Sequence, residues 1–183
     1  MTKLLTFFSI LLLTALPAKA DEIEEILTGA LEAYQEGDAK LAKEEVEYVL
    51  ELLKGVEGEA LAGLLPEPLE GWSKEISDDA MGLAMMGGSG ASANYKHEDG
   101  SYFSVTMTNA PQLIGTMGAM LGNTAMLASM GKIIRIEREK FVLSDRQLQG
   151  VVGGTFYVNF EGNDPEAMQT HLESMDIKAL KDF

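Results

Sequence analysis

The residues that stand out for their chemistry are the methionines, because eight of the 11 in this 183-residue chain fall within fifty positions. They are Met81, Met85, Met86, Met107, Met117, Met120, Met126 and Met130. Thioether side chains fill irregular cores, and they also form adaptable apolar surfaces that repack around different partners. Thioethers are in addition soft ligands that select Cu(I). Three interpretations therefore stand: core filling, a surface for an apolar ligand or partner protein, and a copper site.

The binding interpretation centres on two uncharged Met/Gly segments, residues 80–88 and 111–122. It assigns a ligand or partner surface to Met81, Met85, Met86, Met117, Met120, Leu121 and Trp72. Trp72 is the only Trp in the chain, and a core position where the chain enters the domain is the alternative for it. The copper alternative uses Met85, Met86, Met117 and Met120, although no Cys and no adjacent His supports it. We therefore expect no cofactor, with Cu(I) as the alternative.

Nucleophilic catalysis finds little support in the residue types. The chain has no Cys, and its two histidines, His97 and His171, stand in no nucleophile motif, so we expect both to be solvated. The glycine-rich run at 87–90 lacks the Lys that a phosphate-binding loop needs, so we expect a plain loop there. We predict a non-enzymatic binding or accessory protein, with an uncharacterised enzyme as the alternative.

The Met-rich segment at 111–122 is expected to form a helix with two unlike faces. At 100° per residue, Leu113, Met117 and Met120 fall on one side and Leu121 at its edge. The glycines Gly115, Gly118 and Gly122 line the opposite side. Because glycine permits a close approach, we expect this side to pack tightly on a sheet or on the 81–88 segment, and self-association through it stays open. The pair at 122–123 is expected to end or kink the helix.

The first twenty residues read as an export signal. Lys3 precedes an apolar run from Leu4 to Leu16, and Ala18-Lys19-Ala20 is a small-residue cleavage site. The run is shorter than the roughly 20 residues that span a bilayer, so we expect cleavage after Ala20, a periplasmic location and no membrane span in the mature protein. Without Cys there is no disulfide framework and no acceptor for a lipid anchor.

The charge balance limits the partners. Removing the signal leaves 12 basic and 29 acidic side chains, a net charge of −17. Nucleic acids and anionic membrane surfaces both reward Lys/Arg patches, so this balance argues against either as a partner. The acidity is concentrated at the start of the mature chain, since residues 21–75 carry 16 acidic and 4 basic side chains. We interpret this segment as a helical appendage on a more neutral domain.

Helical periodicity predicts two amphipathic helices, over residues 21–35 and 39–54, in an acidic hairpin at 21–55. Gly37 suits the end of the first helix and Asp38 the start of the second. The hairpin turn resembles that of a tetratricopeptide repeat, of which only one copy is present. Pro66 and Pro68 disfavour helix in a connector at 56–71, and the main domain is expected over residues 72–183. We expect the hairpin to pack on the domain or on a partner, and a solvated hairpin with no partner is the alternative.

Within the main domain the pattern changes to the two-residue period of strands. Alternation at 93–97 and 103–107 around Asp99-Gly100 predicts a β-hairpin. After the Met-rich helix, four strands are expected at 132–138, 140–143, 147–152 and 155–161. Pro165 then suits the first turn of a last helix. The expected fold class is α+β, with an antiparallel sheet flanked by helices.

The order of these elements resembles the Mog1/PsbP-like fold, over about residues 72–180. The chain also resembles a group of exported bacterial proteins that share four features. These are a proline-rich segment ending in Gly-Trp, a Met/Gly stretch, a Met-rich helix followed by Gly-Lys-hydrophobic-x-Arg-Ile, and a strand ending in Glu-Gly, here at 66–72, 81–88, 131–136 and 161–162. The resemblance implies export and the fold, and it implies no activity.

Overall fold

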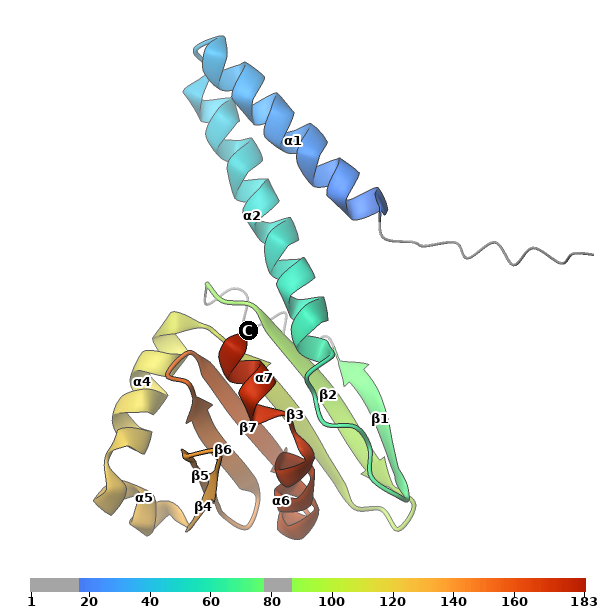
Figure 1. Ribbon diagram of the computed structural model, residues 1–183, viewed down its shortest axis with the longest axis vertical. Coiled ribbons are helices and arrows are strands. Elements are labelled where there is room, and N and C mark those ends of the chain that lie inside the picture. Colours follow the sequence, from blue (N-terminus) through green and yellow to red (C-terminus); the bar gives the residue numbers. More distant parts are fainter. Residues whose placement is uncertain (1–16, 78–86) are drawn as a thin grey trace, which may run out of the picture. The chain divides into compact units, whose positions relative to one another are not determined.

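The computed structural model describes residues 17–77 and 87–183 (Figure 1). Its helices are α1 (Pro17–Gln35), α2 (Ala39–Ala62), α4 (Pro111–Gly122), α5 (Thr124–Met130), α6 (Pro165–Ser174) and α7 (Ile177–Asp182). Its strands are β1 (Trp72–Ser77), β2 (Gly90–His97), β3 (Tyr102–Thr108), β4 (Lys132–Ile136), β5 (Glu139–Leu143), β6 (Gln147–Val152) and β7 (Phe156–Gly162). The chain divides into two compact units, residues 1–52 and 53–183, and the division falls within α2.

The first unit contains a helical hairpin, as predicted. Gly37 adopts a φ of 89°, in the left-handed region that favours glycine. The Asp38 carboxylate accepts a hydrogen bond of 3.0 Å from the Leu41 amide, which starts α2. The glycine therefore ends α1 and the aspartate begins α2.

The second unit is built on one seven-stranded sheet, in the order β1-β2-β3-β7-β6-β5-β4. Every neighbouring pair of strands is antiparallel. The predicted α+β class with an antiparallel sheet is confirmed. The central pair joins distant parts of the chain, because Phe103 of β3 lies opposite Gly162 of β7.

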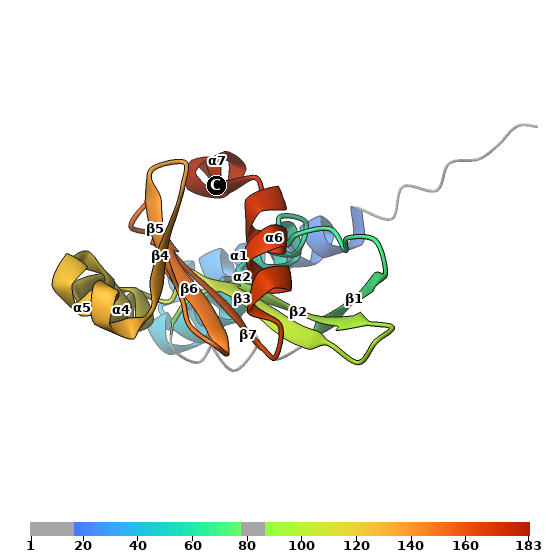
Figure 2. The same ribbon diagram turned by 90° about the horizontal axis from the view of Figure 1, so that it is seen from below.

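Helices cover both faces of the β4–β7 part of this sheet, and Figure 2 shows α4 and α5 on one side of β4–β6 and α6 on the other. The larger core combines one face of the sheet with α6 and α7, and it includes Phe103, Phe141, Phe160, Met168 and Leu172. Leu61 and Leu65, at the end of α2 and just after it, belong to this core. The smaller core, on the opposite face, includes Leu121, Leu127, Val142 and Tyr157.

Two elements differ from the sequence-based expectation. The second helix was predicted to end at Lys54, but α2 continues through Gly55 and Gly58 to Ala62, since it gains a buried anchor at Leu61. Strand β1 was not predicted, because its alternation is weak. Lys74 and Ile76 share a face with Trp72, but Lys74 is polar and half-buried whereas Ile76 is exposed. The structure adds β1 to the predicted hairpin at one edge of the sheet.

The predicted break after the Met-rich helix is confirmed. Helix α4 ends at Gly122, and the side chain of Asn123 accepts hydrogen bonds from the amides of Ala125 and Met126 at 3.1 and 3.2 Å to begin α5. Across residues 17–77 and 87–183, no helix has the combined length and apolar character that crossing a bilayer requires.

Candidate functional site

The described residues include only part of the predicted Met/Gly surface. Met81, Met85 and Met86 lie outside the described residues, so the copper hypothesis that uses two of them stays a prediction. Leu121, predicted as part of the surface, is only 5 % exposed and belongs to the smaller core. Met117 packs partly buried against the same core.

Met117 and Met120, both half-buried, are the predicted surface residues of α4 that keep part of their side chains exposed. Met126 of α5, which the prediction did not include, is 47 % exposed. The opposite side of α4 was expected to pack closely on the sheet through its glycines. A Cβ added at Gly115, Gly118 or Gly122 would meet no described atom within 4 Å. Close packing of this side on the sheet is therefore wrong, because the helix packs on the sheet through Leu113, Ile114 and Met117. Packing on the 81–88 segment stays a prediction, since residues 81–86 lie outside the described residues.

Trp72 instead lines a cleft of about 520 Å³ in the second unit. The cleft lies where the segment before β1, the turn between β2 and β3, and helix α6 meet. Its lining is Leu69, Glu70, Trp72, His97, Asp99, Asp164, Glu166, Ala167, Thr170 and His171. Both histidines of the chain thus meet its only Trp.

Aromatic rings form one wall of this cleft. The Trp72 ring centroid lies 5.1 Å from that of His97, 4.9 Å from that of Phe103 and 5.3 Å from that of His171. Behind them, Tyr95 stacks on Phe103 at 4.7 Å and anchors the preceding segment, because its hydroxyl donates to the Pro66 carbonyl. These contacts hold Trp72 half-buried, as part of the wall of the cleft and in contact with the larger core.

His171 is buried, with no exposed surface, so the expectation of a solvated side chain is wrong. Its Nε2 accepts a hydrogen bond of 3.3 Å from the Leu69 amide, and its Nδ1 lies 2.8 Å from the Ala167 carbonyl oxygen, to which it donates. Burial lowers its pKa, which favours the neutral ring. Because both ring nitrogens are engaged, His171 acts as a structural link between α6 and the segment before β1, with no nitrogen free for acid–base work.

His97 and Asp99 form a pair at the mouth of the cleft. The His97 Nδ1 lies 3.0 Å from an Asp99 carboxylate oxygen. The Ser101 amide donates a hydrogen bond to this carboxylate, and together with the bond to His97 it lowers the pKa of Asp99 to about 2. Asp99 therefore stays negatively charged across the physiological range.

The cleft has four carboxylates in its lining and no Lys or Arg. Asp164 begins α6 and its carboxylate accepts from the Ala167 amide at 2.9 Å, whereas the side chains of Glu70 and Glu166 are exposed at the rim. This arrangement produces a negative potential above an aromatic wall.

The one hydroxyl of the lining, on Thr170, donates to the Glu166 carbonyl oxygen at 2.9 Å. Within the described parts of the chain, no group of three or more His, Asp or Glu side chains could hold a metal ion. The aromatic rings and the carboxylates are thus the main groups that this cleft offers to a ligand.

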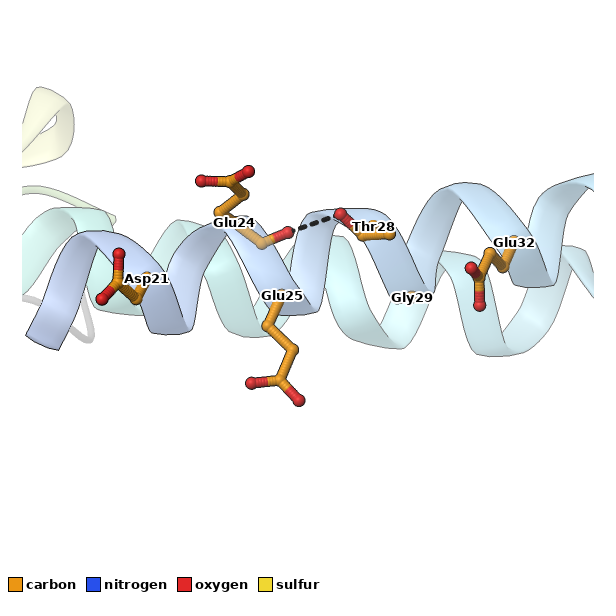
Figure 3. A pocket seen from close by; sticks show the side chains of 6 residues that line it. All are labelled: Asp21, Glu24, Glu25, Thr28, Gly29 and Glu32. Atoms are coloured by element: carbon orange, nitrogen blue, oxygen red, sulfur yellow. Dashed lines mark hydrogen bonds between the residues drawn. The ribbon is translucent and has the colours of Figure 1, made fainter.

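Two further concave regions have linings of a different kind. One, of about 480 Å³, lies over β2, β3 and β7 and is lined by Lys96, Tyr102, Arg146 and Glu161 among others. The other, of about 530 Å³, follows a single helix, α1, and is lined by Asp21, Glu24, Glu25, Thr28, Gly29 and Glu32 (Figure 3). Neither region combines aromatic rings with a charged rim of one sign.

Sequence reasoning found only Trp72 of this cleft and missed its other residues. The three segments that line it are separated by up to a hundred residues, and only the β3–β7 pairing and the packing of α6 bring them together. The one available signal was the acidic character of the segments around both histidines. No protein-family model, no curated protein and no solved structure matches this chain, so the cleft itself is the basis for assigning a function.

Proposed function

We propose that this is an exported, non-enzymatic binding or accessory protein whose cleft at Trp72 holds a Lys or Arg side chain presented by a partner protein. The observation that carries the proposal is the joining of an aromatic wall to four carboxylates with no basic residue in the lining. The proposed site differs from the apolar surface that the sequence predicts. Trp72 is the one residue of that predicted surface that lines the cleft.

The chemistry of the cleft matches such a side chain in two respects. A Lys or Arg stem packs along apolar surface while its charged head stays near solvent, and Leu69, Trp72 and Ala167 offer that surface. The charged head is attracted by nearby carboxylates and by aromatic ring faces. A neutral or anionic ligand is attracted neither to the carboxylates nor to the ring faces as a cation is.

Export and the finer fold assignment are part of the same proposal. The features of the first twenty residues support secretion to the periplasm. The order of hairpin, helix, four-stranded meander and final helix supports a Mog1/PsbP-like arrangement, preceded here by β1 and the helical hairpin. An acidic periplasmic protein would meet basic partners without competition from nucleic acid.

The test uses Trp72, the only Trp, as the reporter. The mature chain is titrated with the blocked tripeptide acetyl-Ala-Lys-Ala-amide while Trp72 emission is recorded, and the matching Glu tripeptide serves as the ligand control. We expect a saturable change with the Lys peptide alone. Exposed charge pairs contribute about 0.2–1 kcal/mol each, so Glu70→Gln with Glu166→Gln should weaken binding about twofold to thirtyfold.

Glu75→Gln is the matched protein control, because Glu75 is an exposed carboxylate of β1 outside the cleft lining. It should leave the affinity unchanged. Equal binding of the Lys and Glu peptides, or an affinity that the double variant leaves intact, would contradict the proposal.

A further inference from the structure

The helical hairpin of the first unit has an unusually thin interior. Its buried side chains within residues 20–52 are Ala30, Ala33, Ala42 and Val49. Small residues let two helices approach closely but remove little apolar surface from water. The larger apolar side chains lie elsewhere, so the two helices alone leave most of their apolar surface without a cover.

Five of these larger side chains form one face, here called the platform: Leu27, Leu31 and Tyr34 on α1, and Val46 and Leu50 on α2. Leu31 is 56 % exposed and Tyr34 is 69 % exposed. On each helix the row lies roughly a quarter turn from the buried positions. The two helices run antiparallel. Viewed from one end, a quarter turn along the chain is therefore clockwise on one helix and anticlockwise on the other, so the two rows lie on the same side of the hairpin.

An acidic row borders the platform. Glu24 is about 60° around α1 from Leu27, and Asp21 and Glu32 follow on the same flank. Figure 3 shows these carboxylates along the helix, with Glu24 and Glu25 pointing to opposite sides. The two basic side chains within residues 20–52, Lys40 and Lys43, are paired with Glu44 and Glu47 of their own helix. The acidic row therefore has no cation from these residues to neutralise it.

Net charge distinguishes between the segments that could cover the platform. Residues 21–52 contain 11 acidic and 2 basic side chains, a net charge of −9, so a second copy would add −9 to the same interface. Residues 53–183 contain 18 acidic and 10 basic side chains, a net charge of −8, so the rest of the same chain is also repelled. Like charges brought together oppose association, and opposite charges favour it.

We propose that the platform is the docking site for a basic amphipathic helix of a partner protein. Its apolar side chains would lie over Leu27, Leu31 and Leu50, in the groove between α1 and α2, and its Lys or Arg side chains would face Asp21, Glu24 and Glu32. Helices bind in this way when their apolar positions recur at i, i+3, i+4 and i+7. The inference rests on the hairpin alone and is independent of the cleft at Trp72.

The experiment measures the fluorescence anisotropy of labelled peptides added to the full mature chain. The probe is a designed 18-residue Leu/Lys peptide with Leu at helical spacing. A Leu/Glu peptide of the same pattern tests charge, and a Leu/Lys peptide of scrambled order tests amphipathicity. We expect the probe to bind at least tenfold more tightly than either control peptide, with an affinity that falls as salt is raised.

The protein variants locate the binding. Leu27→Ser with Leu31→Ser should weaken the probe at least tenfold, and Tyr48→Ser, which removes an exposed apolar side chain from the other flank of α2, should not. Circular dichroism at 222 nm confirms that each variant keeps its helices. Because the cleft is itself proposed to hold a Lys side chain, Leu27→Ser with Leu31→Ser is also measured in a Glu70→Gln/Glu166→Gln background, where it should weaken the probe by the same factor. This comparison separates the inference from the proposed function.

Several results would overturn the inference. One is equal binding of the Leu/Lys and Leu/Glu peptides, and another is a probe affinity that Leu27→Ser with Leu31→Ser leaves unchanged in the cleft-variant background. Sedimentation that shows a dimer which the Leu27/Leu31 variant dissociates would assign the platform to a second copy. A larger hydrodynamic radius for that variant than for the wild type, without peptide, would assign it to residues 53–183 of the same chain.

Discussion

Replacing His171 with Phe tests whether this buried ring links α6 to the segment before β1. Phe preserves most of the ring volume and its edge-on contacts with Trp72 and Phe103, whose centroids lie 5.3 and 4.8 Å from that of His171. It removes the acceptor of the Leu69 amide and the donor to the Ala167 carbonyl. Leaving a buried polar group without its partner costs about 1–3 kcal/mol, so we expect a loss of that size in the free energy of unfolding at pH 7.5.

His171 should also affect how the free energy of unfolding depends on pH. Burial lowers the pKa of His171 in the folded protein, so the unfolded chain takes up this proton more readily than the folded one. The stabilising contribution of the neutral ring is therefore complete above the ordinary histidine pKa of about 6.5 and is lost progressively as the pH falls below it. We expect the wild type to lose stability between pH 7.5 and pH 5, and His171→Phe to lose less over the same range.

The assay is urea unfolding followed by Trp72 fluorescence and circular dichroism at several pH values. His171→Gln serves as the control, because its amide can accept from Leu69 and donate to Ala167 but does not titrate. It should recover part of the stability at pH 7.5 while showing the reduced pH dependence of the Phe variant. If both variants kept the wild-type slope against pH, the assignment of that slope to His171 would be wrong.

Three further substitutions test the packing around the sheet by the same unfolding assay. Gly118→Ala should stabilise the protein by up to about 1 kcal/mol, because the new methyl group meets no described atom within 4 Å and alanine favours helix; a destabilised variant would show that this side of α4 is covered. Gly131→Ala should destabilise it by about 1–3 kcal/mol, because the methyl group would overlap the Leu143 carbonyl; unchanged stability would contradict this contact. Tyr95→Phe should cost about 1–3 kcal/mol by leaving the buried Pro66 carbonyl without its donor, and a neutral result would show that water replaces the hydroxyl.

Local signals were enough to predict most of the second unit. Alternation around Asp99-Gly100 predicted the β2–β3 hairpin, and the four later strands lie within two residues of their expected ends. Asn123 and Asp164 begin helices because their short polar side chains accept backbone amides, an effect that depends only on neighbouring residues. Such features are visible in sequence because no distant contact decides them.

Features decided by tertiary contacts could not be predicted in this way. His171 was expected on a polar helix face, but Leu69, about a hundred positions away, supplies the hydrogen bond that makes its burial tolerable. Leu121 was assigned to a binding surface, whereas Val142 and Tyr157 on the sheet enclose it. The cleft at Trp72 requires three separate segments, so composition and periodicity along one segment give no sign of it.

The pairing of β3 with β7 also determines when the second unit can form. Synthesis delivers β1, β2 and β3 first, but the centre of the sheet stays open until β7, some fifty residues later, has emerged. Until then β3 presents an unpaired edge, which is a template for pairing with another chain. Closing such a long loop is entropically costly, so we expect folding to be slow for a chain of this length and to depend on its last thirty residues. In a cell, the growing chain would therefore need protection from aggregation until β7 has been made.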